Sequence, residues 1–223
     1  MVTKLAGYEE ALKELAQCVL SNPKMGRKEL GRLKIEVARK YLPEFHQGSF
    51  DDPRVKLFIQ DGRKFVSERE AKYDVIILDL VDPMEGGPAY LLYTKEFYSL
   101  VKKALKPGGI VVTQATSPTF SLYAYAIIRN TLATVFKHAV PYMTHVRSFD
   151  GMWGFVAASD HVDPSQLTPE DVDARLAKLV EGELRFYDGT THLWMFTLPK
   201  HIRRGLEEEK RIATDKEPVF MPA

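Results

Sequence analysis

Two carboxylates, three positions apart, follow one apolar stretch of the chain. Residues 73–78 are mostly apolar, and Asp79 and Asp82 come soon after them, before Pro83 and the glycine pair 86–87. In open α/β sheets, ligands bind beyond the carboxyl ends of the strands, so a site is expected here. One carboxylate could bind a cation while the other accepts a proton, provided that their environments hold their pKa values apart. The alternative is a strand end followed by a plain Asp-Pro turn.

The rest of the sequence predicts the elements that hold this pair. Short apolar runs alternate with helical patterns from Val55 onward, which predicts successive βα units and a mainly parallel sheet. The predicted strands are 55–60, 75–80, 110–114, 140–146 and 154–159. The predicted helices are 63–69, 94–105, 122–136, 172–180 and 202–211. We therefore expect an α/β fold whose last two strands form an antiparallel hairpin around a turn at 149–151.

Composition narrows the class of protein. The chain has 223 residues, 45% of them hydrophobic, and 31 Lys and Arg against 30 Asp and Glu. This balance lacks the basic excess of a nucleic-acid binder, so we expect no nucleic-acid partner. Cys18 is the single cysteine, and we find neither a signal peptide nor an apolar run of membrane-spanning length, which predicts a cytoplasmic protein without a membrane partner. The six histidines lack metal-ligand spacing, and we predict no metal.

A series of short motifs resembles the polyamine aminopropyltransferases, that is, spermidine synthase and its relatives. The motifs occur in the family's order and are Asp79-Leu-Val-Asp82-Pro83, Gly86-Gly87-Pro88-Ala89, Leu92-Tyr93-Thr94 and Glu96-Phe97-Tyr98. The stretches 82–88, 112–115 and 153–160 are most similar to the thermospermine synthase branch. The resemblance extends from Ile35 to the C-terminus. It implies a Rossmann-like sheet of the class I methyltransferase type.

The same resemblance implies an activity in polyamine biosynthesis. An aminopropyl group would pass from decarboxylated S-adenosylmethionine, a co-substrate, to an amine of the spermidine or putrescine type, releasing methylthioadenosine. No prosthetic group is implied. Asp79 would accept or guide the proton of the attacking amine, and Asp82 would anchor the polyamine through its carboxylate. Gln114, Glu85 and Trp153 are further candidates for amine binding. Their alternatives are a satisfied turn amide, a solvated loop acid and plain aromatic packing.

The nucleoside part of the co-substrate would have its own residues. Asp61 and Gly62 resemble the family's adenine-recognition pair, although an acid in this position could instead cap a helix. The resemblance also places Pro88, Ala89 and Leu92 around the adenine, whereas Tyr93 could be simply a core residue. Glu29 falls near the position of the family's ribose-binding acid.

The first 34 residues depart from the family pattern. Where the family has a glycine-rich turn, residues 6–11 keep one glycine and one Glu but place side chains where backbone should approach the ligand. We therefore divide the chain into an atypical helical segment (1–34), an aminopropyltransferase-like core (35–197) and a charged helix with a tail (198–223). A truncated or frame-shifted gene, or a genuine short paralogue, would explain the abrupt boundary.

Two other functions stay open at this stage. One is an S-adenosylmethionine-dependent methyltransferase, which shares the fold but gives no special reason for the paired carboxylates. The other is a non-catalytic family member that acts as a binding or oligomerising module, which the altered N-terminus favours. The sequence leaves open the amine acceptor, the activity of this chain and its oligomeric state, including a homo-oligomer.

Overall fold

The computed structural model describes residues 2–22 and 24–221. Its contacts divide the chain into two compact units, Met1–Gly62 and Arg63–Ala223. The predicted domain boundaries at 34 and 197 differ from this division and stay predictions.

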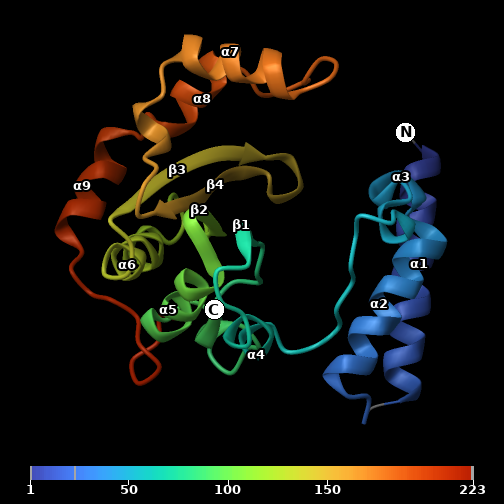
Figure 1. Cartoon of the computed structure of the whole chain (residues 1–223). Coiled ribbons are helices and arrows are strands. Elements are labelled where there is room, and N and C mark those ends of the chain that lie inside the picture. The colour runs from blue at the N-terminus through green and yellow to red at the C-terminus, as the bar shows by residue number, and fades with distance from the viewer. Residues whose placement is uncertain (1, 23, 222–223) are drawn as a thin grey trace. The chain divides into compact units, whose positions relative to one another are not determined.

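The first unit is helical. It contains α1 (Val2–Ser21), α2 (Arg27–Tyr41), α3 (Pro43–His46) and the 3-10 helix η1 (Ser49–Asp51) (Figure 1). The Glu14 carboxylate of α1 accepts hydrogen bonds from Lys40 Nζ (2.8 Å) and from the Tyr41 hydroxyl (2.5 Å), which joins α1 to α2. The segment 6–11, compared above with a glycine-rich turn, lies inside α1 and is helical.

The predicted strand at 55–60 is wrong. None of these residues has strand structure or a ladder partner among the described residues. Val55, Leu57 and Phe58 are exposed, with 56% of Phe58 accessible to solvent. Apolar character favours a strand, but a strand is stable only when a neighbour pairs with its backbone. Asp61 therefore does not end a strand, and it directly precedes α4 (Gly62–Ser67).

The second unit is built on a mixed four-stranded sheet. Its strands are β1 (Tyr73–Leu78), β2 (Leu105–Gln114), β3 (His138–Val146) and β4 (Gly151–Ser159), in the order β1-β2-β4-β3 (Figure 1). β1 and β2 are parallel, and β4 is antiparallel to both β2 and β3. The predicted α/β fold and its C-terminal antiparallel hairpin are confirmed. The described sheet is mixed and not mainly parallel, because the segment 55–60 adds no strand beside β1.

Several helices belong to the second unit, and some of them pack on this sheet. They are α5 (Lys95–Ala104), α6 (Leu122–Ala133), α7 (Pro169–Leu179), α8 (Gly189–Phe196) and α9 (Lys200–Glu208), with the 3-10 helices η2 (Tyr90–Leu92), η3 (Arg147–Phe149) and η4 (Pro164–Gln166). As predicted, a helix begins after Thr168, whose hydroxyl accepts from Asp171 N (3.1 Å), with Pro169 in the first turn. α8 is not among the helices predicted from the sequence.

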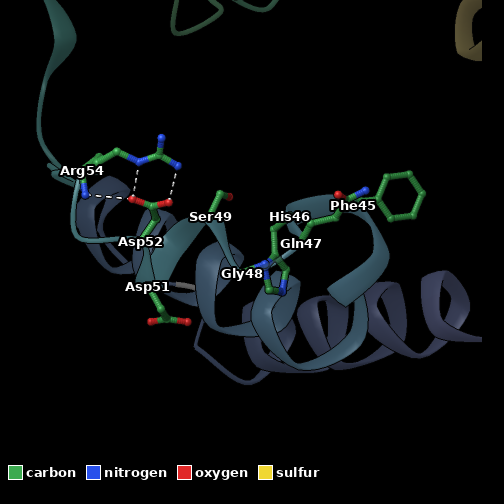
Figure 2. A pocket seen from close by; sticks show the side chains of 8 residues that line it. All are labelled: Phe45, His46, Gln47, Gly48, Ser49, Asp51, Asp52 and Arg54. Atoms are coloured by element: carbon green, nitrogen blue, oxygen red, sulfur yellow. Dashed lines mark hydrogen bonds and ion pairs between the residues drawn. The ribbon is translucent and has the colours of Figure 1, made fainter. Parts of the chain in front are cut away.

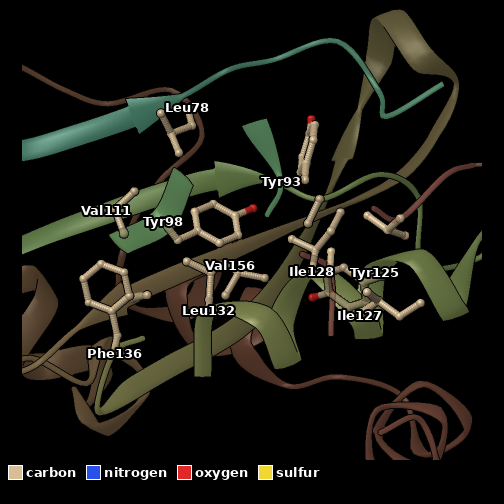
Figure 3. Close-up of a cluster of buried hydrophobic side chains, with 14 of the residues drawn as sticks. Leu78, Tyr93, Tyr98, Val111, Tyr125, Ile127, Ile128, Leu132, Phe136 and Val156 are labelled. Atoms are coloured by element: carbon tan, nitrogen blue, oxygen red, sulfur yellow. The ribbon is translucent and has the colours of Figure 1, made fainter. Parts of the chain in front are cut away.

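Successive strand residues point to opposite sides of the sheet, and the two faces are covered differently. On one face, Val111 and Val156 are fully buried. Figure 3 shows them in one cluster with Tyr98 of α5 and Leu132 of α6. On the other, the Phe196 ring of α8 packs on Tyr142 with their centroids 5.0 Å apart. At β1 this second face is open, and Ile77 is 73% exposed. The open face leaves room for a ligand beside the strand ends.

The C-terminal tail, the described residues after α9, lies against other parts of the second unit. Lys95 N donates to Ala213 O (2.9 Å), and Ala213 N donates to Thr131 Oγ1 (2.8 Å). Further along, Met221 N donates to Pro83 O (2.9 Å). The tail therefore ties α5, α6 and the loop after β1 together.

Candidate active site

A pocket lies at the carboxyl ends of the two parallel strands. Its volume is about 1130 Å³, and it is open to solvent. Because β1 and β2 are parallel, their ends meet at one edge, and this edge brings Asp79 and Asp82 beside Gln114. Trp153 reaches the same pocket from β4. The remaining lining is mainly apolar: Val75, Ile77, Leu78, Leu80, Val81, Val112, Tyr142, Val146, Ser148, Phe149 and Phe155.

The amide of Gln114 is at the centre of a hydrogen-bond network. Its side chain is buried, with the residue 6% exposed. Its Oε1 accepts from Trp153 Nε1 and from the backbone N of Thr116, both at 2.9 Å. Its Nε2 donates to Leu80 O (2.8 Å) and to Asp82 Oδ1 (3.1 Å). Gln114 therefore links the loop after β1 to the hairpin strand β4.

Tyr93 completes this network on the core side. Gln114 Nε2 lies 2.6 Å from the Tyr93 hydroxyl, which donates to Val81 O (3.0 Å). Burial is the main cause that raises the pKa of Tyr93, and the neighbouring Tyr98 and Asp82 add to it. The phenol therefore stays protonated at neutral pH and acts as a donor. The sequence analysis left Tyr93 as a core residue; its place in the Leu-Tyr-Thr motif was the available signal for this second role.

The two carboxylates have different surroundings. Asp79 is exposed, and its side chain has no hydrogen bond within the described residues. Asp82 is partly buried; burial raises its pKa, and the hydrogen bond from Gln114 opposes that rise. Paired acids in unequal environments can take unequal roles, one binding charge and the other moving a proton. A bound ammonium beside Asp82 would favour its ionised form.

Aromatic rings line part of the same pocket. The Phe149 and Trp153 centroids are 4.5 Å apart, and those of Tyr142 and Phe155 are 5.3 Å apart in a stacked arrangement. Such a wall suits the methylene groups of an aliphatic amine, and ring faces attract ammonium groups. Tyr142 of β3 and Phe155 of β4 were not predicted as site residues. The available signal was the alternation of side chains along a strand, which places every second residue on the pocket face.

Several predicted binding residues lie outside this lining. Glu85 and Pro88 are exposed in the loop after β1, while Ala89 is buried in the core and Leu92 is partly buried against it. Their predicted roles with the amine (Glu85) and the adenine (the others) stay predictions.

The other nucleoside candidates belong to the first unit. The Glu29 carboxylate accepts a hydrogen bond from Gly26 N (3.0 Å) at the start of α2, so it has a capping role. Asp61 and Gly62 are at the end of this unit. A contact of these residues with adenine or ribose stays a prediction.

A second hollow, of about 690 Å³, is confined to residues 45–54 of the first unit. Figure 2 shows Arg54 and Asp52 joined by two parallel side-chain hydrogen bonds of 2.9 and 2.7 Å. Arg54 and Asp52 are thus paired with each other, and we assign no ligand to the hollow.

Among the described residues, no three His, Cys, Asp or Glu side chains gather closely enough to hold a metal ion. Likewise, no described helix is long and apolar enough to cross a membrane.

This fold and pocket define an α/β protein of the class I methyltransferase type with a carboxylate site at the ends of its parallel strands. The family model of the spermine/spermidine synthase domain matches residues 29–167. The chain belongs to the spermine/spermidine synthase family.

Individual relatives agree with this assignment. The chain is 57% identical to polyamine aminopropyltransferase 2 of Hyperthermus butylicus, over 84% of this chain and 62% of that protein. It is 48% identical to the polyamine aminopropyltransferase of Sulfolobus acidocaldarius, over 98% of this chain and 72% of that protein. A solved spermidine synthase in complex with the transition-state analogue AdoDATO has a TM-score of 0.68 at 30% identity, over 78% of this chain and 58% of that one. The chain thus spans 62% of the length of the Hyperthermus relative.

Proposed function

We propose that this protein transfers an aminopropyl group from decarboxylated S-adenosylmethionine to an amine acceptor in polyamine biosynthesis. The observation that carries the proposal is the pocket that joins Asp79 and Asp82 to an aromatic wall at the ends of β1 and β2. The names of the relatives, and the AdoDATO complex of a solved spermidine synthase, support it.

The chemistry needs a neutral amine and a sulfonium. The amine nitrogen attacks the propyl carbon bonded to sulfur, a C–N bond forms, the C–S bond breaks, and its electron pair returns to sulfur in methylthioadenosine. The nitrogen then loses a proton. Asp79, an exposed residue of the pocket lining, is the proposed proton acceptor, and Asp82 holds a second ammonium of the polyamine. The acceptor is an amine of the spermidine or putrescine type.

Product analysis tests this proposal. The protein is incubated with decarboxylated S-adenosylmethionine and either putrescine or spermidine, and methylthioadenosine and the elongated amine are measured by mass spectrometry. Both products should form in equal amounts. A parallel reaction with S-adenosylmethionine tests the methyltransferase alternative, and a methylated amine there, without aminopropyl transfer, would contradict the proposal.

The altered N-terminus favours a second candidate function, a non-catalytic binding or oligomerising module. The segment 6–11, compared with the family's glycine-rich turn, is part of the helix α1. Titration with methylthioadenosine by calorimetry, beside an Asp61→Ala variant, distinguishes the two. Binding that the variant loses supports an intact nucleoside site, whereas no binding by a folded chain supports the module.

We also infer a cytoplasmic location and small-molecule substrates only. The near-zero net charge and the single Cys18 support this inference. Cell fractionation tests the location, and light scattering of the purified protein tests whether it forms a homo-oligomer.

A further inference from the structure

The orientation of the Gln114 amide is defined from both of its ends. Trp153 Nε1 and Thr116 N can only donate, so the atom facing them, each at 2.9 Å, must be the amide oxygen. Leu80 O can only accept, so the atom 2.8 Å from it must be the amide nitrogen. A flipped amide would oppose like groups at all three contacts.

We propose that Trp153 is a positioning residue: its indole N–H, together with the Thr116 backbone N–H, holds Gln114 so that the amide nitrogen always faces Asp82. A rotated amide would place its oxygen 3.1 Å from the Asp82 carboxylate, where two acceptors repel each other, and loss of the indole N–H weakens the hold against this rotation. The indole therefore acts on Asp82 through Gln114 and without touching it.

The backbone at Thr116 supports this assignment. Thr116 is fully buried and has a φ of 66°, in the left-handed region that a β-branched residue rarely adopts. This conformation is strained for a residue with a Cβ, so surrounding contacts must maintain it. Thr116 O accepts from Gly154 N (2.7 Å), next to Trp153, while Thr116 N donates to Gln114. The strained turn and Trp153 thus form one rigid support for the amide.

This inference changes the roles predicted for two residues. Gln114 presents only its N–H groups toward Asp82, and the ammonium that Asp82 would hold cannot accept a hydrogen bond, so Gln114 acts on that ammonium through Asp82. The indole N–H is already bonded, so Trp153 offers a ligand only its ring. The catalytic meaning rests on the proposed function, but the hydrogen-bond arrangement does not.

The test measures the pKa of the Asp82 carboxyl by ¹³C NMR in the full chain without substrates. Trp153→Phe keeps an aromatic ring but removes the N–H, and Gln114→Met removes the amide. Phe149→Leu is the matched control, because it removes the ring packed 4.5 Å from Trp153 and leaves the N–H in place. We expect an upward shift in the first two variants and none in the control. Adding Trp153→Phe to Gln114→Met should cause no further shift.

Other outcomes would overturn the proposal. An unchanged Asp82 pKa in a folded Trp153→Phe variant would show that the indole does not hold the amide, and an equal shift in Phe149→Leu would assign the effect to packing. If Trp153→Phe does not fold, proton exchange of the Gln114 side-chain amide in the unaltered protein decides: slow exchange supports the fixed amide, and exchange at the free-amide rate contradicts it. Because no substrate is present, the result is independent of whether the chain catalyses aminopropyl transfer.

Discussion

At the scale of single residues, the two acids of the pocket differ in what surrounds them. Asp79 is exposed, whereas Asp82 is partly buried and bonded to Gln114. Burial disfavours the ionised form of Asp82, and a bound ammonium would favour that form again. We therefore expect their substitutions to affect different kinetic constants.

Asp79→Asn should lower kcat about 10²–10⁴-fold, because it removes the proposed proton acceptor. Asp82→Asn should mainly raise the KM for the amine, because it removes a charge that holds the substrate. Methylthioadenosine release at several amine concentrations measures both constants. Glu85→Gln, an exposed acid of the same loop outside the pocket lining, is the control for a general loss of negative charge. Equal effects of the two aspartate variants on kcat would contradict this division.

The partial burial of Asp82 also predicts a pH dependence of stability. Burial raises the pKa of Asp82 above its ordinary value of 3.8, so the folded state binds this proton more tightly than the unfolded state. Ionisation of Asp82 therefore costs stability, and the cost grows as the pH rises from 3.8 through the folded value. Asp82→Asn should raise the free energy of unfolding at pH 7, and this gain should vanish near pH 3.8. Urea unfolding across this pH range measures it, and a gain independent of pH would contradict the explanation.

At the scale of elements, the packing of β4 on the turn after β2 supports the site. A Cβ added at Gly154 would lie 2.5 Å from Tyr125 Cε2 and 2.9 Å from Thr116 O. Neither the buried ring nor the strained backbone can move freely. Glycine at 154 is therefore a condition for the close approach of β4 to this turn.

Gly154→Ala should lower the free energy of unfolding by about 1–3 kcal/mol, because the added methyl overpacks a filled core. The same variant should disturb the contact between Trp153 and Gln114. Chemical denaturation measures the stability. Gly62→Ala is the control, since a Cβ there meets no atom within 4 Å, and it should change stability by less than about 1 kcal/mol. A Gly154→Ala variant as stable as the unaltered protein would contradict the packing described here.

At the scale of the whole molecule, a C-terminal acid joins distant parts of the second unit. Arg63 donates to Asp215 through two bonds of 2.9 and 2.6 Å, and the Thr94 hydroxyl donates to it at 2.7 Å. Arg63 is the main cause that lowers the pKa of Asp215, and Thr94 adds to it. The tail thus connects the start of the unit to the start of α5.

Asp215→Asn should lower the free energy of unfolding at pH 7 by about 1 kcal/mol, a modest value because the pair is partly exposed. The pKa of Asp215 is below its ordinary value of 3.8, so its contribution is complete above 3.8 and is lost as the pH falls through the folded value. Thermal unfolding at pH 7 and at low pH measures the difference. Glu208→Gln, which breaks an exposed pair with Arg204, should have almost no effect and serves as the control. A pH-independent loss for Asp215→Asn would contradict the role of the charge.

Local patterns in the sequence were enough to predict the α/β fold, the final hairpin, and the acids and Gln114 at the ends of neighbouring strands. The site residues follow short apolar runs that end in polar residues. In a parallel sheet, the carboxyl ends of such strands lie at one edge. The strand at 55–60 was predicted wrongly for the same reason. Its pattern is that of a strand, but a strand exists only through pairing with another segment, which a local pattern does not contain.

Tertiary structure alone decided how the pocket is held together. Gln114 is hydrogen-bonded to Trp153, 39 positions away in the sequence, and to Tyr93, 21 positions away. Met221 of the tail is hydrogen-bonded to Pro83. These contacts depend on strand register, on the strained turn at Thr116 and on the direction of single donor and acceptor groups. The sequence by itself determined which chemical groups are present and on which elements they lie. Their hydrogen-bond partners and the burial that shifts the Asp82 pKa come only from the folded arrangement, because both depend on residues far apart in the chain.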